Sequence, residues 1–179
     1  MKNILILSAL FLAFGARAEG PQVSEYSQTI AGNNKVGLLF MKNVVAEEAS
    51  KGEKNVMTSP LSLYYALSLA YNGAANKTLN DLSLYLGSPY TELEQYNADA
   101  QGFQKSLIIK EKAAPNEWSP KPPVFGIANS AWQAEGTFKF NNDYLKTIKK
   151  YYGAEFQSLN FKDAASADGS NGWAENQTN

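Results

Sequence analysis

The chain has 179 residues without internal repeats, and its 16 basic and 17 acidic residues leave it almost neutral. It contains no cysteine and no histidine, which excludes disulfides, zinc sites built from Cys and His, haem ligation and nucleophiles activated by histidine. The charge also argues against a nucleic-acid partner, which normally needs a basic surface.

The first 18 residues have the features of a secretory signal peptide. Lys2 precedes an apolar stretch from Ile4 to Phe14, and Ala16-Arg17-Ala18 supplies a small-x-small cleavage site. We predict cleavage after Ala18, and hence a secreted or periplasmic protein. The apolar stretch is too short to span a bilayer and no cysteine follows it to carry a lipid, so we expect no membrane association after cleavage.

The first elements of the remaining chain are a predicted helix and a short predicted strand. Apolar residues recur at helical spacing from Asn34 to Ala49, which predicts an amphipathic helix. A polar turn follows, and residues Asn55 to Thr58 are predicted to form a strand. Glu47 and Glu48 fall on this helix, where a solvated face explains them better than catalysis does.

An almost wholly apolar helix is the most informative element. Ser59 suits an N-cap and Pro60 the first helical turn, and the helix runs from Leu61 to Tyr71 until Gly73 stops it. Because no polar face interrupts it, we expect it to be covered on nearly all sides. Its few hydroxyl groups, among them Ser62, should then have specific hydrogen-bond partners.

Two further helices are predicted from their capping patterns. Thr78-x-x-Asp81 resembles a capping box before a short helix that ends at Gly87. Thr91-x-x-Glu94 repeats this pattern before a longer amphipathic helix that reaches about Ile109. The acidic pair Glu92 and Glu94 is again explained better by first-turn charge than by catalysis.

The second half of the chain alternates strands and helices. Residues 113–123 are rich in proline and predict a loop, and 124–132 predict a strand covered on both faces. Asn129 lies inside that strand, and we interpret it as a hydrogen-bonded core amide rather than a ligand contact. A helix from Asn142 to Tyr152, ended by Gly153, and a strand from Ala154 to Phe161 complete the pattern.

These motifs resemble the serpin family. Around the apolar helix, the matching residues are Asn55, Ser59, Pro60, Ser62, Leu67, Gly73, Ala74, Thr78, Leu86 and Gly87. Farther along, the matching residues are Asn129, Tyr144, Tyr151 to Glu155, Leu159 to Phe161, Asn171, Trp173 and Thr178. The resemblance covers about residues 36–179, in the order of the family's elements.

The resemblance implies an α+β fold that is the N-terminal portion of a serpin. It would hold about six helices and parts of the main and second β-sheets, in a partial domain over residues 19–179 that ends near the close of the sixth helix. The fold-signature residues are Asn55, Ser59, Pro60, Ser62, Leu67, Gly73, Thr78, Asn129, Phe161, Asn171, Trp173 and Thr178. Ser59 and Ser62 match the shutter beneath the main sheet, and the reactive-centre loop is absent. No cofactor is implied.

The sixth helix departs from the family pattern. Ser170 and Ala174 stand where bulky aliphatic residues are usual, and Gly169 and Gly172 each cost about 1 kcal/mol in a helix interior. We therefore expect this helix to be frayed or poorly docked.

Three functions stay open. The first is a protease inhibitor of the serpin class, whose target would be a serine or cysteine protease and whose loop would come from the C-terminal half. The second is a non-inhibitory interaction protein or an inactive remnant. The third is a hydrolase that uses carboxylates alone, which the sequence favours least, so we expect no enzyme. Without a complementing C-terminal polypeptide, the isolated chain is expected to be molten or prone to aggregation, because each unburied Leu or Tyr forfeits roughly 1.5–3 kcal/mol.

Overall fold

A computed structural model describes residues 26–52, 55–88, 92–108, 125–163 and 165–178. The elements in chain order are α2 (Ser27–Ser50), α3 (Pro60–Gly73), α4 (Asn76–Leu86), α5 (Leu93–Leu107), β1 (Ser130–Ala134), α6 (Asn142–Tyr152), β2 (Glu155–Leu159) and α7 (Ser166–Thr178). The strands β1 and β2 pair in parallel, with Ser130 opposite Glu155 and Ala134 opposite Leu159. The signal peptide and the proline-rich loop expected at 113–123 lie outside the described residues.

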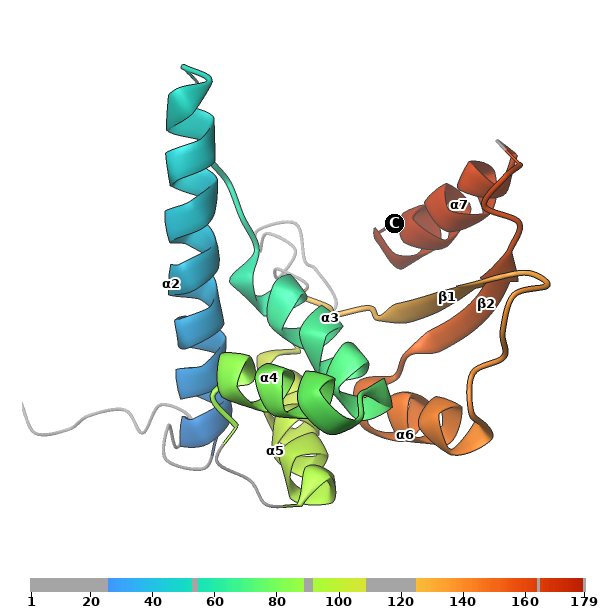
Figure 1. Cartoon of the computed structure of the whole chain (residues 1–179), viewed down its shortest axis with the longest axis horizontal. Coiled ribbons are helices and arrows are strands. Elements are labelled where there is room, and N and C mark those ends of the chain that lie inside the picture. Colours follow the sequence, from blue (N-terminus) through green and yellow to red (C-terminus); the bar gives the residue numbers. More distant parts are fainter. Residues whose placement is uncertain (1–25, 53–54, 89–91, 109–124, 164, 179) are drawn as a thin grey trace, which may run out of the picture.

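Helix α3 is the centre of the helical body. It contacts α2, α4 and α6, and Figure 1 shows it between the long helix α2 and the α6 end of the molecule. Two buried clusters lie along it. One joins Tyr65 and Leu69 to residues of α5 and α6, and the other joins Tyr64 and Tyr71 to residues of α2, α4 and α5.

The described residues cover α3 only in part, which agrees with the expectation that later strands of the complete fold supply much of its cover. Its tyrosines are buried, but Ser62, Ala66 and Ala70, which are spaced one turn apart, are exposed. The uncovered stripe therefore holds only small side chains. Exposing it costs much less than exposing a Leu or a Tyr would.

The local signals at the ends of α3, α4 and α6 are confirmed. Ser59 caps α3, with its Oγ accepting a hydrogen bond from the Ser62 backbone N–H at 3.3 Å, and Pro60 occupies the first turn. Gly87 and Gly153 end α4 and α6 in the left-handed conformation, with φ of 64° and 60°. Helix α6 has the predicted bounds and is capped by Asn141.

Two predicted helix starts and the first predicted strand are wrong. Helix α4 begins at Asn76, so Thr78 lies within its first turn, and Asp81 pairs with Lys77 instead of capping. The N-cap of α5 is Glu92 without a side-chain hydrogen bond, and Thr91 lies outside the described residues. Residues 55–58 form no strand, because no described segment pairs with them.

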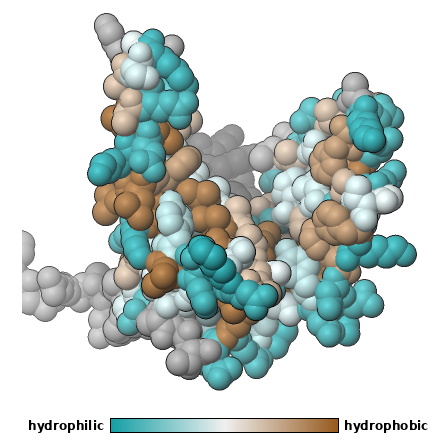
Figure 2. Space-filling model, in the orientation of Figure 1, coloured by the Kyte–Doolittle hydropathy of each residue, from teal (hydrophilic) through white to brown (hydrophobic). Residues whose placement is uncertain are grey.

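Helix α2 begins at Ser27, seven residues before the predicted start. Its added turns are held by tertiary contacts: Thr29 and Gly32 are buried, and the Tyr26 ring lies 6.3 Å from the ring of Phe103 on α5. The apolar residues Leu38, Leu39 and Val45 of α2 are exposed. Figure 2 shows hydrophobic surface on the visible side of α2 and along α3.

The strands are shorter than predicted. Strand β1 begins at Ser130 rather than at residue 124, because its register with β2 starts there, with Ser130 opposite Glu155. Strand β2 spans Glu155–Leu159 within the predicted 154–161. Among the described residues these two strands form the only sheet, so the part of a second sheet that we expected is not formed there.

Helix α7 is continuous over thirteen residues, so the expectation of fraying is wrong. Its docking is weak, as expected, because no described side chain of the helix is buried. Trp173 makes the main contacts, with an edge-to-face approach of 6.2 Å to Trp132 and a hydrogen bond from its Nε1 to Glu155 Oε2 at 3.0 Å.

Candidate functional site

The two serines at the start of α3 bind each other. Their Oγ atoms are 2.7 Å apart, and the Ser59 hydroxyl also accepts from the backbone of Ser62. Both residues are exposed. The expected specific partner of the Ser62 hydroxyl is therefore present, and because that hydroxyl is exposed among the described residues, it can exchange its partner for another group at little cost in desolvation.

These serines line a groove of about 350 Å³ between α3, the segment that leads into β1, and α7. The described residues around it include Ser59, Ser62, Ala66, Asn129 and Trp173. Four of the residues predicted from the sequence are thus brought together in one place, although more than 100 positions separate the first from the last. We call this hollow the serine groove.

Asn129 holds the entry of β1 against the end of α6. Its Nδ2 donates to the Tyr152 carbonyl at 2.9 Å, and its own carbonyl accepts from the Glu155 backbone at 3.0 Å. The side chain is half-buried. These contacts match the predicted role of a hydrogen-bonded core amide.

The other predicted signature residues are spread over the fold. Pro60 packs against Gly37 of α2, Leu67 is half-buried in the second cluster, and Gly73 ends α3 beside the Tyr144 ring. Asn55, Thr78, Phe161 and Asn171 are exposed, and Thr178 is the last residue of α7. The structure brings none of these into the serine groove.

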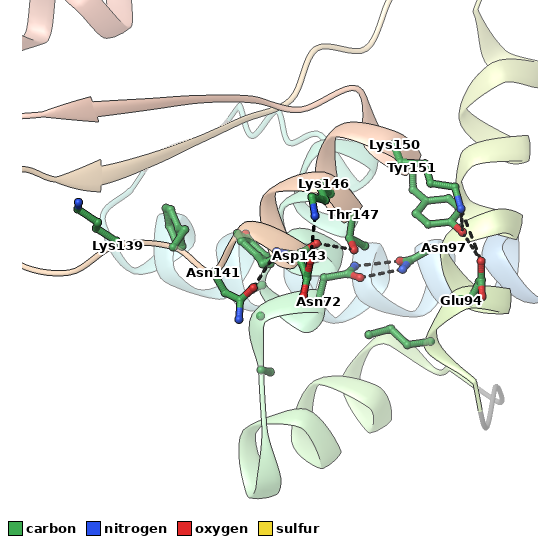
Figure 3. Close-up of a pocket in the computed structure, with 16 residues that line it drawn as sticks. Asn72, Glu94, Asn97, Lys139, Asn141, Asp143, Lys146, Thr147, Lys150 and Tyr151 are labelled. Carbon is green, nitrogen blue, oxygen red and sulfur yellow. Dashed lines mark hydrogen bonds and ion pairs between the residues drawn. The ribbon is translucent and has the colours of Figure 1, made fainter.

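A second hollow of about 890 Å³ was not predicted from the sequence. It lies between the end of α3, the start of α5, and α6 with the segment before it (Figure 3). We call it the lysine groove after Lys139, Lys146 and Lys150, which line it.

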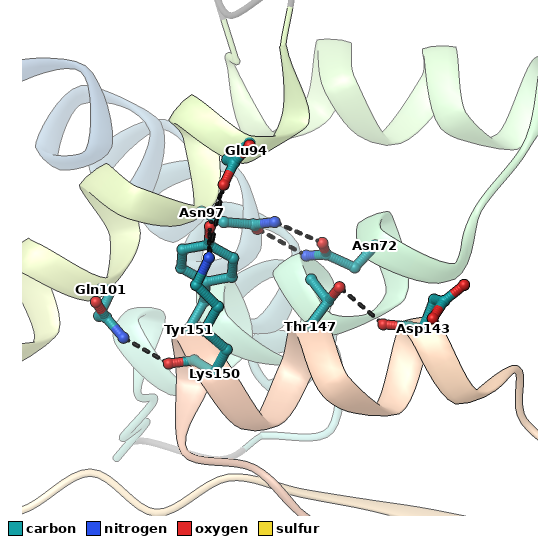
Figure 4. A network of polar contacts seen from close by, with 8 residues as sticks. All are labelled: Asn72, Glu94, Asn97, Gln101, Asp143, Thr147, Lys150 and Tyr151. Atoms are coloured by element: carbon teal, nitrogen blue, oxygen red, sulfur yellow. Dashed lines mark hydrogen bonds and ion pairs between the residues drawn. The ribbon is translucent and has the colours of Figure 1, made fainter.

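A network of amides forms the floor of the lysine groove. Asn72 of α3 and Asn97 of α5 exchange two hydrogen bonds, of 2.9 Å and 2.7 Å, and Tyr152 donates from its hydroxyl to Asn97 Oδ1 at 2.6 Å (Figure 4 shows the amide pair). These residues lie 25 to 80 positions apart along the chain. No periodic pattern could have indicated them.

Charged groups at one end of the lysine groove are coupled through a tyrosine. The Tyr151 hydroxyl donates to Glu94 at 2.8 Å and accepts from Lys150 at 2.7 Å. The hydrogen bond from Tyr151, together with the nearby ammonium group, lowers the pKa of Glu94, and the same hydroxyl raises the pKa of Lys150. The sequence had indicated only first-turn charge for Glu94.

The described residues hold no group of three or more Asp or Glu side chains suited to a metal ion. Among those residues, no helix combines the length and apolar character that crossing a membrane would require.

Comparison with protein-family models matches residues 31–179 to the family described as serpin (serine protease inhibitor). The chain belongs to the serpin family. Iripin-8 of Ixodes ricinus is 29% identical over 173 residues, covering 94% of the chain and 40% of the relative. Human neuroserpin is 30% identical over 132 residues, covering 73% of the chain and 30% of the relative.

Solved serpin structures have the same fold. The latent state of the thermophilic serpin tengpin matches with a TM-score of 0.63 and 28% identity, covering 90% of this chain and 38% of that one. The Arabidopsis serpin AtSerpin1 in its native stressed conformation gives a TM-score of 0.66 at 23% identity, covering 89% and 37%. The chain thus covers 30% to 40% of the length of these four serpins, and the predicted partial serpin fold is confirmed.

Proposed function

We propose that this chain is the N-terminal portion of a serpin-type inhibitor of serine or cysteine proteases. In that mechanism the protease cleaves an exposed loop, the loop inserts into the main sheet as an added strand, and the acylated protease is carried with it. The loop would belong to the C-terminal half. The 179 residues would act as scaffold and would not inhibit alone.

One observation carries this proposal. The serine groove sets Ser59 and Ser62 beside the entry to β1, and the edge of β1 away from β2 has no partner among the described residues. A strand that joined this edge would pass close to two exposed hydroxyls that already share a hydrogen bond. Such hydroxyls could exchange their bond as strands move apart, which is the role proposed for them as a shutter.

The exposed apolar surface supports a complementing C-terminal polypeptide. Ala66 of α3 is exposed beside the serine groove, and Leu38 of α2 is 74% exposed. Burying apolar surface of this kind contributes about 25 cal/mol for each Å². We propose that the C-terminal half of the serpin covers these surfaces.

We also propose that the protein is exported. Residues 1–18 would be removed as a signal peptide, and residues 19–179 would form the partial domain. Mass spectrometry of the chain after expression with an export pathway tests this, with an N-terminus at Glu19 expected. Retention of Lys2 in exported protein would contradict it.

A chimera tests the inhibitory function. Residues 31–179 would replace the matching portion of Iripin-8, and the product would be mixed with a panel of serine and cysteine proteases. We expect a covalent complex that survives denaturing electrophoresis with at least one protease of the panel, with unmodified Iripin-8 run in parallel as the reference, and none with the 179-residue chain alone. A folded chimera that is cleaved without forming a complex would instead favour the alternative, a non-inhibitory interaction protein or an inactive remnant. The weak docking of α7 is the observation that favours this alternative.

A further inference from the structure

The lysine groove shares no lining residue with the serine groove, and the proposed inhibition does not use it. Its volume of about 890 Å³ falls in the range of small-molecule sites, roughly 300–1,000 Å³. In Figure 3 the residues around it extend from Lys139 at one end to Glu94 at the other, with the amide pair of Asn72 and Asn97 between them.

Two of the three lysines that line the groove are paired with carboxylates of its own wall. Lys146 lies 3.3 Å from Asp143, and Lys150 lies 3.6 Å from Glu94. A polyanion drawn to the lysines would also meet both carboxylates, which repel it. A purely apolar ligand would remove water from these ions and amides without replacing their hydrogen bonds. The two ion pairs and the amides therefore favour an uncharged, polar ligand over a polyanion or a purely apolar molecule.

The lining retains hydrogen-bonding capacity of both kinds. Asn97 is 2% exposed, and its Nδ2 donates one hydrogen to Asn72 while the second has no partner among the described residues. The Thr147 hydroxyl donates to the Asp143 carbonyl and keeps its lone pairs as acceptors. Asn141 uses its Oδ1 as a cap for α6, which leaves its NH₂ group without a partner in the described part of the chain.

Aromatic rings supply the apolar part of the wall. Phe140 and Tyr144 both line the groove, and their ring centroids are 5.2 Å apart. Both residues are half-buried. Ring carbons beside amides and hydroxyls suit a ligand that has C–H surfaces as well as hydroxyl groups.

We propose that the lysine groove, with Asn97, Asn141 and Thr147 beside the rings of Phe140 and Tyr144, binds an uncharged polyhydroxylated ligand of the sugar class. Each sugar hydroxyl can donate and accept at once, so it satisfies the mixed lining without breaking the two ion pairs. The C–H faces of a sugar ring would pack on Phe140 and Tyr144.

The test measures saturable binding of neutral trisaccharides of glucose, mannose, galactose and N-acetylglucosamine to the full chain by saturation-transfer NMR and calorimetry. Thr147→Trp fills the groove, whereas Lys149→Trp places the same ring on α6 at an exposed position that does not line it. We expect at least one sugar to bind, with affinity about tenfold weaker in Thr147→Trp and unchanged in Lys149→Trp. Thr147→Met is a smaller filler if the first variant does not fold by circular dichroism.

Three results would overturn the proposal. They are no saturable binding by any neutral sugar, equal losses in the Thr147 and Lys149 variants, or much tighter binding of a sulfated heparin trisaccharide than of any neutral one. The readout involves no protease, so its failure is distinguishable from a failure of the inhibitory function.

Discussion

Helices α6 and α7 lie on opposite sides of the same two-stranded sheet in Figure 1, yet only α6 is built into a core. Ile148, Tyr151 and Tyr152 of α6 are buried, and both ends of the helix are capped. Helix α7 has Gly169 and Gly172 and no buried described side chain. The difference shows that a helix docks when its sequence places large apolar residues on one face. Complete backbone hydrogen bonding within the helix, which α7 also has, is not enough.

The largest expected effect is that alkaline pH lowers the stability of the helical body around α6. Burial raises the pKa of Tyr64, Tyr65, Tyr96 and Tyr152. Their contribution to stability is complete below the unfolded pKa of about 10, and it falls as pH rises further, by up to about 1.4 kcal/mol for each tyrosine and pH unit. We expect loss of helix above about pH 10, coincident with tyrosinate absorbance. Gradual ionisation without loss of helix would contradict it.

Next in size is the effect of Tyr65→Ala. This fully buried ring joins α3 to α6, and its hydroxyl donates to the Ala100 carbonyl at 3.0 Å. The substitution should lower the free energy of unfolding by about 3–5 kcal/mol, as large aromatic truncations in cores do. Urea denaturation followed by circular dichroism measures it. Tyr65→Phe is the control, and it should lose only the hydrogen bond.

Gly153→Ala should destabilise the end of α6 through backbone strain alone, which separates α6 from α7 further. Gly153 has φ of 60°, and no atom lies within 4 Å of the position that a Cβ would take. The expected cost is about 1–2 kcal/mol from left-handed strain, measured by thermal melting. Gly172→Ala in α7 is the matched control. It also meets open space, but without positive φ, so it should stabilise its helix. Equal effects of both changes would argue against this explanation.

The smallest effect is expected for Trp173→Ala. Its indole contacts Trp132 and Glu155 at the surface, so global stability should fall by only about 1 kcal/mol. Hydrogen exchange should show faster opening of α7 with α6 unchanged. A loss as large as that of Tyr65→Ala would mean that α7 belongs to the cooperative core.

Local chemistry explains the elements that could be predicted. Ser59, Pro60, Gly87 and Gly153 act through their own backbone and side-chain preferences, and each stands at the helix end where it was expected. Capping patterns were less reliable at α4. There Thr78 and Asp81 fitted the motif, but the helix begins two residues before Thr78.

Elements that depend on a partner could not be placed from the sequence. The sequence predicts a strand at residues 55–58, but no described strand pairs with this segment. Strand β1 begins at Ser130 because its register with β2 starts there. The lysine groove was missed for a related reason. Asn72, Asn97 and Tyr152 come from three helices, and nothing in the spacing of the chain relates them.

The sequence by itself determined which segments form α3, α4 and α6, because caps, stop glycines and apolar periodicity act over a few residues. The family and the partial extent followed from the resemblance of its motifs, in their order along the chain, to those of serpins. Only the tertiary structure decided that α3 keeps a bare stripe of small residues, that Ser59, Ser62, Asn129 and Trp173 meet in one groove, and that a second groove exists. These features depend on contacts between helices and strands far apart in the chain, where packing rather than local preference sets the arrangement.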